Sequence, residues 1–166
     1  PSRPQAIDAM ADALVTFVID GISHNIPFLA ALMQHPRWRE GRLTTGFIDE
    51  EFPDGFSPLA PDKDQQKVLA AIGLAVELLR KDRLDRHGDR FAPHPGTLRR
   101  QWSVKLDDEW LDVEIRSGSV ALPLALEVSI RGGTSYTIES DWRPGQIVWI
   151  GRIAGKRVAA QIRPIL

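Results

Sequence analysis

Residues 68–76, VLAAIGLAV, form a run of nine residues without a polar side chain, and Leu78 and Leu79 follow it. Asp62 or Asp64 can cap a helix that begins just upstream of this run. Because nine residues cover every side of a helix, this helix would be apolar all round. Each large side chain left in water would cost about 1.5–3 kcal/mol. The run is too short for the roughly 20 residues that span a bilayer, so a protein shell must enclose it.

The last third of the chain can supply that shell. From Trp102 onward, apolar and polar residues alternate with period two, which predicts strands at 102–106, 111–115, 120–130, 135–140, 146–153 and 157–163. Turn-forming residues separate them at 107–108, 117–119, 131–133, 143–145 and 154–156. Pro123 lies inside the third run and predicts a bulge or an unpaired edge there. Short antiparallel strands at this spacing predict a meander that curls into a barrel around the helix.

The first part of the chain has a different pattern. Apolar residues spaced by three and four predict a helix over residues 5–16, and residues 17–19 predict a short buried strand. Asn25 can cap a second helix that has Pro27 in its first turn and ends at Pro36. This segment is too small to bury both apolar stripes within itself, so we expect a larger body to cover it.

The segment PDGFSPLAPD concentrates the residues of an irregular connector. We therefore expect a helical region at 1–52, a linker at 53–61 and a second domain at 62–166. The fold class predicted is α+β: a small helical segment, then a central apolar helix wrapped by an antiparallel β-barrel or a strongly curled meander.

Composition excludes several classes of protein. The 166 residues carry a net charge of −1, which removes any global electrostatic case for binding nucleic acid or an anionic membrane. There is no cysteine, hence no disulfide or thiolate metal site, and no apolar run of membrane-spanning length. These features favour a cytoplasmic setting, or a mitochondrial one in a eukaryote.

The sequence contains no recognisable catalytic or metal-binding constellation. The four histidines lie in separate contexts without metal-ligand spacing, so no metal site is predicted. Ser23 and His24 could mimic a nucleophile and its base, but a helix-capping turn explains them better. The carboxylate pair of Glu50 and Glu51 falls where a solvated helix end is expected. We predict no catalytic residue in this chain.

Two basic segments could serve as binding surfaces. The first contains Arg37, Trp38, Arg39 and Arg42, and Glu40 interrupts it; we favour a surface turn anchored by Trp38 over a nucleic-acid site. The second, residues 80–100, is a long loop that is rich in arginine and stiffened by proline. Long loops of this kind are usually functional or disordered.

Several motifs resemble the alpha subunits of biotin-dependent acyl-CoA carboxylases, in particular those of the propionyl-CoA type. Near the end of the biotin carboxylase domain, that family has a strand ending in Asp-Gly, a helix cap and a closing segment with a conserved pattern. These match, in order, Asp20, Gly21, Ser23, Asn25, Ile26, Gly41, Thr45, Phe47 and Ile48, followed by residues 52–56. WSVKL at 102–106 resembles the first strand of the family's subunit-docking module, a central helix in an antiparallel barrel.

The resemblance implies that this chain docks the biotin carboxylase part on a carboxyltransferase beta subunit, with the rest of the alpha subunit as its other partner. Phe91, Pro93, His94 and Pro95 correspond to the hook that contacts the beta subunit. Thr45 and Gly46 correspond to the edge of the adenine pocket, although Gly46 replaces a bulkier residue.

The resemblance also implies what this chain lacks. The ATP-grasp residues, the glycine-rich lid and the Ala-Met-Lys-Met biotin-attachment motif do not occur in it. The whole enzyme would use biotin, ATP and Mg. This chain opens at Pro1 without an initiator methionine, so we expect an inactive fragment with no cofactor of its own, truncated within the docking module.

Two other functions predict different features of the chain. A stand-alone barrel that binds a small ligand predicts an interior cavity, whereas the apolar helix predicts a filled interior. A free-standing hydrolase would need a convergent nucleophile and base, which the sequence does not provide.

Overall fold

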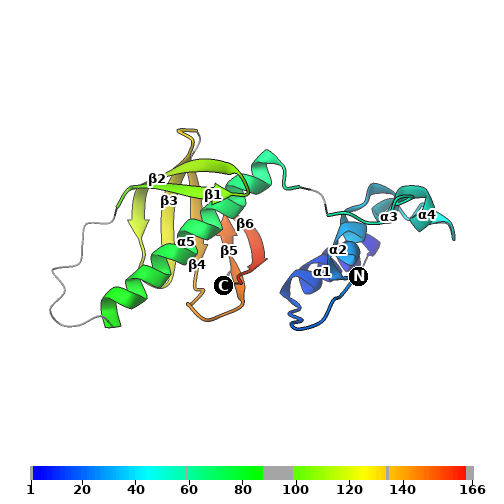
Figure 1. Ribbon diagram of the computed structural model, residues 1–166, viewed down its shortest axis with the longest axis horizontal. Coiled ribbons are helices and arrows are strands. Elements are labelled where there is room, and N and C mark those ends of the chain that lie inside the picture. The colour runs from blue at the N-terminus through cyan, green and yellow to red at the C-terminus, as the bar shows by residue number, and fades with distance from the viewer. Residues whose placement is uncertain (1, 59, 88–98, 134, 164–166) are drawn as a thin grey trace. The chain divides into compact units, whose positions relative to one another are not determined.

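The computed structural model describes residues 2–58, 60–87, 99–133 and 135–163, except the side chains of residues 86 and 87. The chain divides into two compact units, unit 1 (Pro1–Ala60) and unit 2 (Pro61–Leu166). Unit 1 is helical, and unit 2 packs one long helix against an antiparallel sheet (Figure 1). The predicted α+β class is therefore confirmed.

Unit 1 contains four helices: α1 (Arg3–Thr16), α2 (Ile26–Gln34), α3 (Pro36–Glu40) and α4 (Phe47–Glu51). As predicted, α2 begins after Asn25 and has Pro27 in its first turn, although the Asn25 side chain makes no capping hydrogen bond. Pro36 follows the end of α2 and opens α3, where its missing N–H removes no helical bond. The predicted strand at 17–19 is wrong. Phe17 has an extended backbone, but residues 17–19 form no strand, and the described part of unit 1 has no strand to pair with them.

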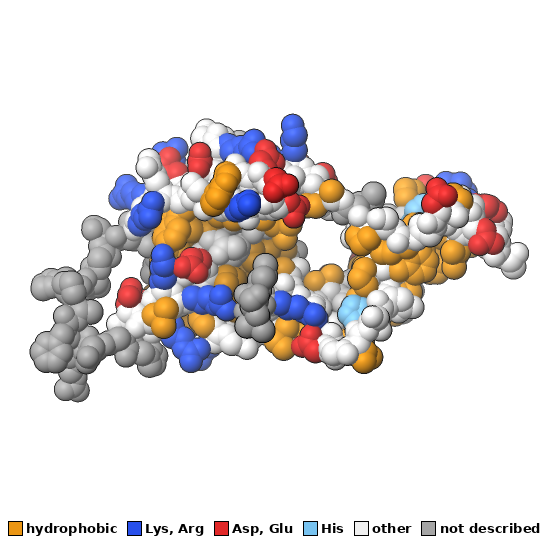
Figure 2. Space-filling view, viewed as in Figure 1, with side chains coloured by type: hydrophobic (Ala, Val, Ile, Leu, Met, Phe, Trp, Pro, Cys, Tyr) orange, Lys and Arg blue, Asp and Glu red, His pale blue; other side chains and the backbone are white. Residues whose placement is uncertain are grey.

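The core of unit 1 is small. Ile7, Leu32, Met33 and Phe47 are buried, and the rings of Phe28 and Phe52 pack edge to face with centroids 5.3 Å apart. The apolar stripe of α1 is only partly covered, since Met10 is 50% exposed, and Phe17 just beyond the helix is 62% exposed. Hydrophobic side chains also gather on the visible face of this unit (Figure 2). Unit 1 thus leaves apolar surface in contact with solvent, as its sequence predicted.

Unit 2 begins with α5 (Lys63–His87), which contains the apolar run. Asp62 is its N-cap: the Asp62 carboxylate accepts hydrogen bonds from the backbone N–H groups of Asp64 and Gln65 at 2.9 and 2.8 Å. The Gln65 side chain in turn accepts a bond from the N–H of Asp62 at 2.9 Å. This reciprocal pair satisfies amide groups that the first helical turn leaves free.

Six strands follow, and each pairs antiparallel with the next in sequence order. They are β1 (Gln101–Leu106), β2 (Glu109–Ser119), β3 (Leu124–Ile130), β4 (Ser135–Ser140), β5 (Val148–Ile153) and β6 (Lys156–Gln161). The meander curls into a half-barrel, and α5 lies across its concave face (Figure 1). In the described part of unit 2, β1 and β6 are the two edges and do not pair with each other.

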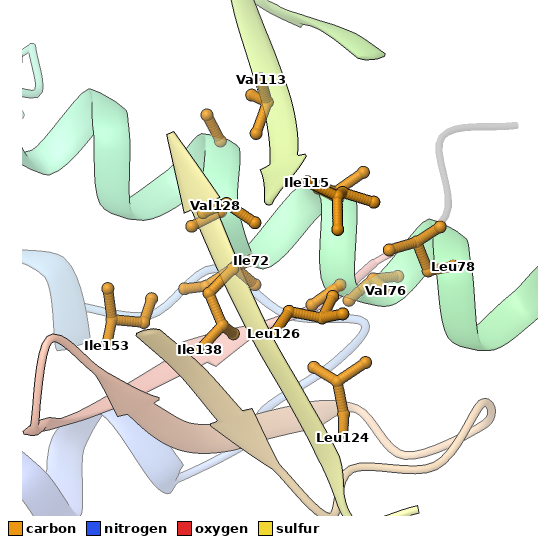
Figure 3. Packing of buried hydrophobic residues seen from close by; sticks show 14 of the residues in the cluster. Ile72, Val76, Leu78, Val113, Ile115, Leu124, Leu126, Val128, Ile138 and Ile153 are labelled. Carbon is orange, nitrogen blue, oxygen red and sulfur yellow. The ribbon is translucent and has the colours of Figure 1, made fainter. Parts of the chain in front are cut away.

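Alternate residues of the strands and one side of α5 form the core of unit 2. Ile72 and Val76 of α5 point toward Leu126 of β3 (Figure 3). The largest fully buried side chains come from both layers and include Leu74, Leu124, Val128, Ile138 and Trp149. The expectation that the helix is enclosed on every side is wrong, because a half-barrel covers only part of it. A line of residues along the helix stays exposed, namely Leu69, Gly73, Arg80 and Leu84.

The connection between β2 and β3 differs from the prediction. Residues 117–119, predicted as a turn, belong to β2 and pair with Glu127, Leu126 and Ala125. The register shifts between Ile115 and Ser117, so a bulge lies in β2 and not at Pro123. Pro123 sits in the true turn, after a cis Leu122–Pro123 peptide, and β3 begins only at Leu124. The Ser-Gly-Ser sequence at 117–119 is typical of a turn, but here glycine is used within the strand, where Gly118 has a positive φ of 116°.

We expect Leu74→Ala to lower the free energy of unfolding of unit 2 by about 2–5 kcal/mol, because Leu74 is 1% exposed and truncation leaves a cavity. Leu84→Ala is the matched control on the same helix: Leu84 is 70% exposed, so the change should stay within about 0.5 kcal/mol. Urea unfolding followed by circular dichroism measures both. Equal losses for the two variants would contradict the core assigned to α5.

Gly118→Ala should destabilise the sheet more than Gly132→Ala, although both glycines have positive φ angles. A Cβ at Gly118 would lie 2.2 Å from the backbone oxygen of Ala125, whereas nothing lies within 4 Å of one at Gly132. The Gly132 variant therefore reports the conformational cost alone, about 1–2 kcal/mol. Thermal unfolding of both variants tests this, and a Gly118 variant no less stable than the Gly132 variant would show that β2 and β3 are not this close.

Candidate functional site

The most connected polar cluster of unit 1 joins α3 to α4 through Arg37. One guanidinium nitrogen of Arg37, Nη1, donates to Glu50 Oε2 at 2.8 Å and to Glu51 Oε1 at 2.5 Å. The Arg37 guanidinium also lies over the ring of Phe47, 5.3 Å from its centroid. His35 Nε2 is 3.1 Å from the second oxygen of Glu51. The cluster thus links residues 13 and 14 positions apart in the sequence.

The contacts with Arg37 also lower the pKa values of the two carboxylates. Hydrogen bonds from Arg37 first, and from Thr44 second, lower the pKa of Glu50 below its ordinary value of 4.5. The pKa of Glu51 is lowered mainly by its hydrogen bond from Arg37. Because folding lowers these pKa values, the stability they contribute is present above about pH 4.5 and is lost as the pH falls through the lowered values. Arg37, Glu50 and Glu51 are therefore all charged at neutral pH.

Thr45 and Gly46, predicted at the edge of a nucleotide pocket, form the turn that leads into α4. Thr45 is exposed and Gly46 is half-buried, while Phe47 after them is buried in the core of unit 1. The turn is tied to the cluster by Thr44, whose hydroxyl donates to Glu50 Oε1 at 3.1 Å. Thr45 and Gly46 therefore lie together on the surface of unit 1. The hydrogen bonds from Thr44 and Arg37 to Glu50 link their turn to α3, and the sequence alone did not predict this network.

The remaining members of the basic-aromatic segment also have partners within unit 1. Arg39 pairs with Asp8 at 2.7 Å and donates to the carbonyl of Met33 at 3.1 Å. Arg42 pairs with Glu40 at 2.5 Å. The indole of Trp38 packs against the small core. This arrangement agrees with a structural surface turn rather than a nucleic-acid site.

Phe91, Pro93, His94 and Pro95, predicted to contact a partner subunit, lie outside the described residues and stay a prediction. Described residues flank them. Lys81 Nζ, six residues before the end of α5, lies 4.6 Å from the ring centroid of Trp102, and the Arg99 guanidinium lies 5.7 Å from it. The Trp102 indole N–H donates to the carbonyl of Arg99 at 2.7 Å. Trp102, in the first strand of the sheet, thus contacts one described residue before the segment and one after it.

The cavities found in unit 2 lie on its surface. One, of about 390 Å³, is lined by the polar residues Gln101, Ser103, Asp112 and Glu114 on β1 and β2. Another, of about 370 Å³, lies over β4 to β6 beside Ile150 and Gly151. The space between α5 and the sheet is instead filled by buried side chains. Within the described residues, no group of three or more metal-ligating side chains comes together. Nor is any helix there long and apolar enough to cross a membrane.

Comparison with known proteins agrees with this division of the chain. Residues 69–166 match the model of the propionyl-coenzyme A carboxylase BT domain, and residues 1–50 match that of the biotin carboxylase C-terminal domain. Residues 51–68, which contain the segment expected to be a linker, lie outside both matches.

Among curated relatives, the chain is 38% identical to the propionyl-CoA carboxylase alpha chain of Ruegeria pomeroyi over 149 residues, which cover 87% of this chain and 21% of that protein. It is 34% identical to the mitochondrial alpha chain of Rattus norvegicus over 143 residues, or 84% of this chain and 19% of the relative. The human mitochondrial alpha chain is 30% identical over 144 residues, again 84% and 19%. The chain thus spans about a fifth of the length of these relatives. It belongs to the family of propionyl-CoA carboxylase alpha chains, of which it carries a biotin carboxylase C-terminal segment and a BT domain.

Proposed function

We propose that this chain is the assembly part of a biotin-dependent propionyl-CoA carboxylase, joining the biotin carboxylase portion of the alpha subunit to the carboxyltransferase beta subunit. The observation that carries this proposal is the BT-domain match over 69–166, which coincides with a helix-filled half-barrel. An interior packed with side chains suits a rigid scaffold and leaves no room for a small ligand.

The role is mechanical. In the whole enzyme, the biotin carboxylase site would carboxylate biotin with ATP, Mg and bicarbonate, and the beta subunit would pass the carboxyl group to the α-carbon of the acyl-CoA. An attached biotin can serve two sites only if both lie within its reach, and linkage then supplies a high effective concentration. Unit 2 would hold the two sites at that separation.

Two contacts complete the proposal. Phe91, Pro93, His94 and Pro95 would touch the beta subunit. They lie between Lys81 and Arg99, which both contact the ring of Trp102 in unit 2. Thr45 and Gly46 would border the adenine of ATP, which is supported by their surface position in the unit matched to the biotin carboxylase C-terminal domain.

The cellular setting follows from the relatives. The matched alpha chains include one from the bacterium Ruegeria pomeroyi and several named as mitochondrial. We therefore propose the bacterial cytoplasm, or the mitochondrial matrix in a eukaryote, as the place where this chain acts.

The folded chain should bind a propionyl-CoA carboxylase beta subunit in a pull-down, and Phe91→Ala should weaken that binding about tenfold or more, as expected for a buried aromatic anchor. Phe17→Ala is the matched control, because Phe17 is an exposed phenylalanine of unit 1 that the proposal leaves outside the interface. Binding is quantified by calorimetry, with circular dichroism to confirm folding. A folded chain that ignores the beta subunit would refute the docking role.

The isolated chain should carboxylate no free biotin when it is given ATP, Mg and bicarbonate, because it contains neither the ATP-grasp residues nor a glycine-rich lid. Incorporation of labelled bicarbonate measures the reaction, and a complete alpha chain serves as the positive control. Turnover that rises with the concentration of the purified chain would contradict a purely mechanical role.

A further inference from the structure

We infer that Arg37 is a positioning residue for nucleotide binding: through Glu50 and Thr44 it fixes the turn at residues 44–46 that carries Thr45 and Gly46. This inference rests on the proposed placement of Thr45 and Gly46 beside adenine. The hydrogen-bonded group that supports this turn is hereafter called the Arg37 latch. It consists of Arg37, Glu50, Glu51 and Thr44.

The turn at residues 44–46 leads into α4, a helix of only five residues, and helices this short are not stable by themselves. Two backbone bonds close the turn, from the N–H of Phe47 to the carbonyl of Thr44 at 3.2 Å and from the N–H of Glu50 to that of Gly46 at 2.9 Å. Both are local, so the longer-range restraints on the turn come from side chains. Phe47 supplies an apolar one, because it is buried in the core of unit 1, and Glu50 supplies a polar one.

Glu50 provides that restraint because its two oxygens have different partners. Oε1 accepts from the Thr44 hydroxyl at 3.1 Å, on the turn, and Oε2 accepts from Arg37 Nη1 at 2.8 Å, on α3. The carboxylate of Glu50 thus bridges the turn and the preceding helix. Hydrogen bonds of this kind, with charged groups on one or both sides, are among the stronger ones in proteins.

Arg37 is itself held from several sides. Besides Glu50, it bonds to Glu51 at 2.5 Å and to the carbonyl of Arg42 through Nε at 3.4 Å, and its side chain is only 22% exposed. His35 engages the remaining oxygen of Glu51 at 3.1 Å. A lysine has one point charge on a flexible stem and could not reproduce these separate contacts of a planar guanidinium.

Gly46 fits the same latch. Its φ of −88° needs no glycine, so its small size is explained by space and not by conformation. A Cβ at this position would lie 3.2 Å from Glu50 Oε1, the oxygen that Thr44 uses. Because Arg37 holds the other oxygen of the same carboxylate, Glu50 could move aside only by weakening the latch. A glycine at position 46 therefore leaves the Glu50 carboxylate free to bind Thr44 and Arg37 at the same time.

The test uses a chimera in which residues 1–166 replace the matching segment of the Ruegeria pomeroyi alpha chain, assayed for ATP-dependent carboxylation of biotin. Arg37→Gln should raise the KM for ATP about tenfold with kcat within about twofold, the signature of lost uniform binding. Arg37→Lys should recover only part of the affinity. Arg42→Gln is the control, because Arg42 is an exposed neighbour whose side chain pairs only with Glu40 in the described structure; its KM should not change.

A second variant covers the case in which Arg37→Gln does not fold. Thr44→Val removes only the exposed hydroxyl that joins the turn to Glu50, so it should fold and still raise the KM for ATP about threefold, with kcat nearly constant. An inactive chimera without further substitution would refute the proposed function of the segment. An active chimera whose KM for ATP is unchanged by Arg37→Gln, or by folded Thr44→Val, would overturn the Arg37 latch alone.

Discussion

Burial of one side of α5 in the concave face of the sheet is the interaction on which unit 2 depends. Leu74 and its neighbours on the helix meet inward-facing residues of the strands, including Ile138 and Trp149, and no solvent reaches them. Removing such surface from water is the main favourable term in folding. The helix and the curled strands therefore share one core, and Trp102 of β1 packs against it.

Unit 1 is stabilised differently. Its core contains four buried hydrophobic residues, so ion pairs and aromatic contacts at α3 and α4 carry more of the organisation. Arg37 joins Glu50 and Glu51 while lying over Phe47, and His35 completes the network at Glu51. Meanwhile Met10 and Phe17 remain half or more exposed. A unit with this little buried apolar surface is marginal alone. The polar network is correspondingly important for holding the turn at Thr45 and Gly46.

The two units differ in what they present. In the described part of unit 2, buried side chains fill the space between α5 and the sheet. Unit 1, which matches the biotin carboxylase C-terminal domain, carries a surface turn. The described residues of unit 1 link the turn at residues 44–46 to Arg37 through Thr44 and Glu50. In unit 2, Lys81 and Arg99 both contact the ring of Trp102.

Much of this fold could be read from local patterns. The apolar run at 68–76, the Asp62 cap and the alternating residues after Trp102 predicted a helix within a curled antiparallel sheet, because such patterns reflect which side of an element is buried. The sequence patterns gave wrong predictions where residues distant in the sequence determine the local structure. Residues 17–19 have strand character but no strand to pair with, and Gly118 continues β2 although its flanking serines signal a turn. Likewise, Arg37 was visible in the sequence, but its partners 13 and 14 residues away were not, since only packing of α3 against α4 brings a guanidinium and two carboxylates within hydrogen-bonding distance.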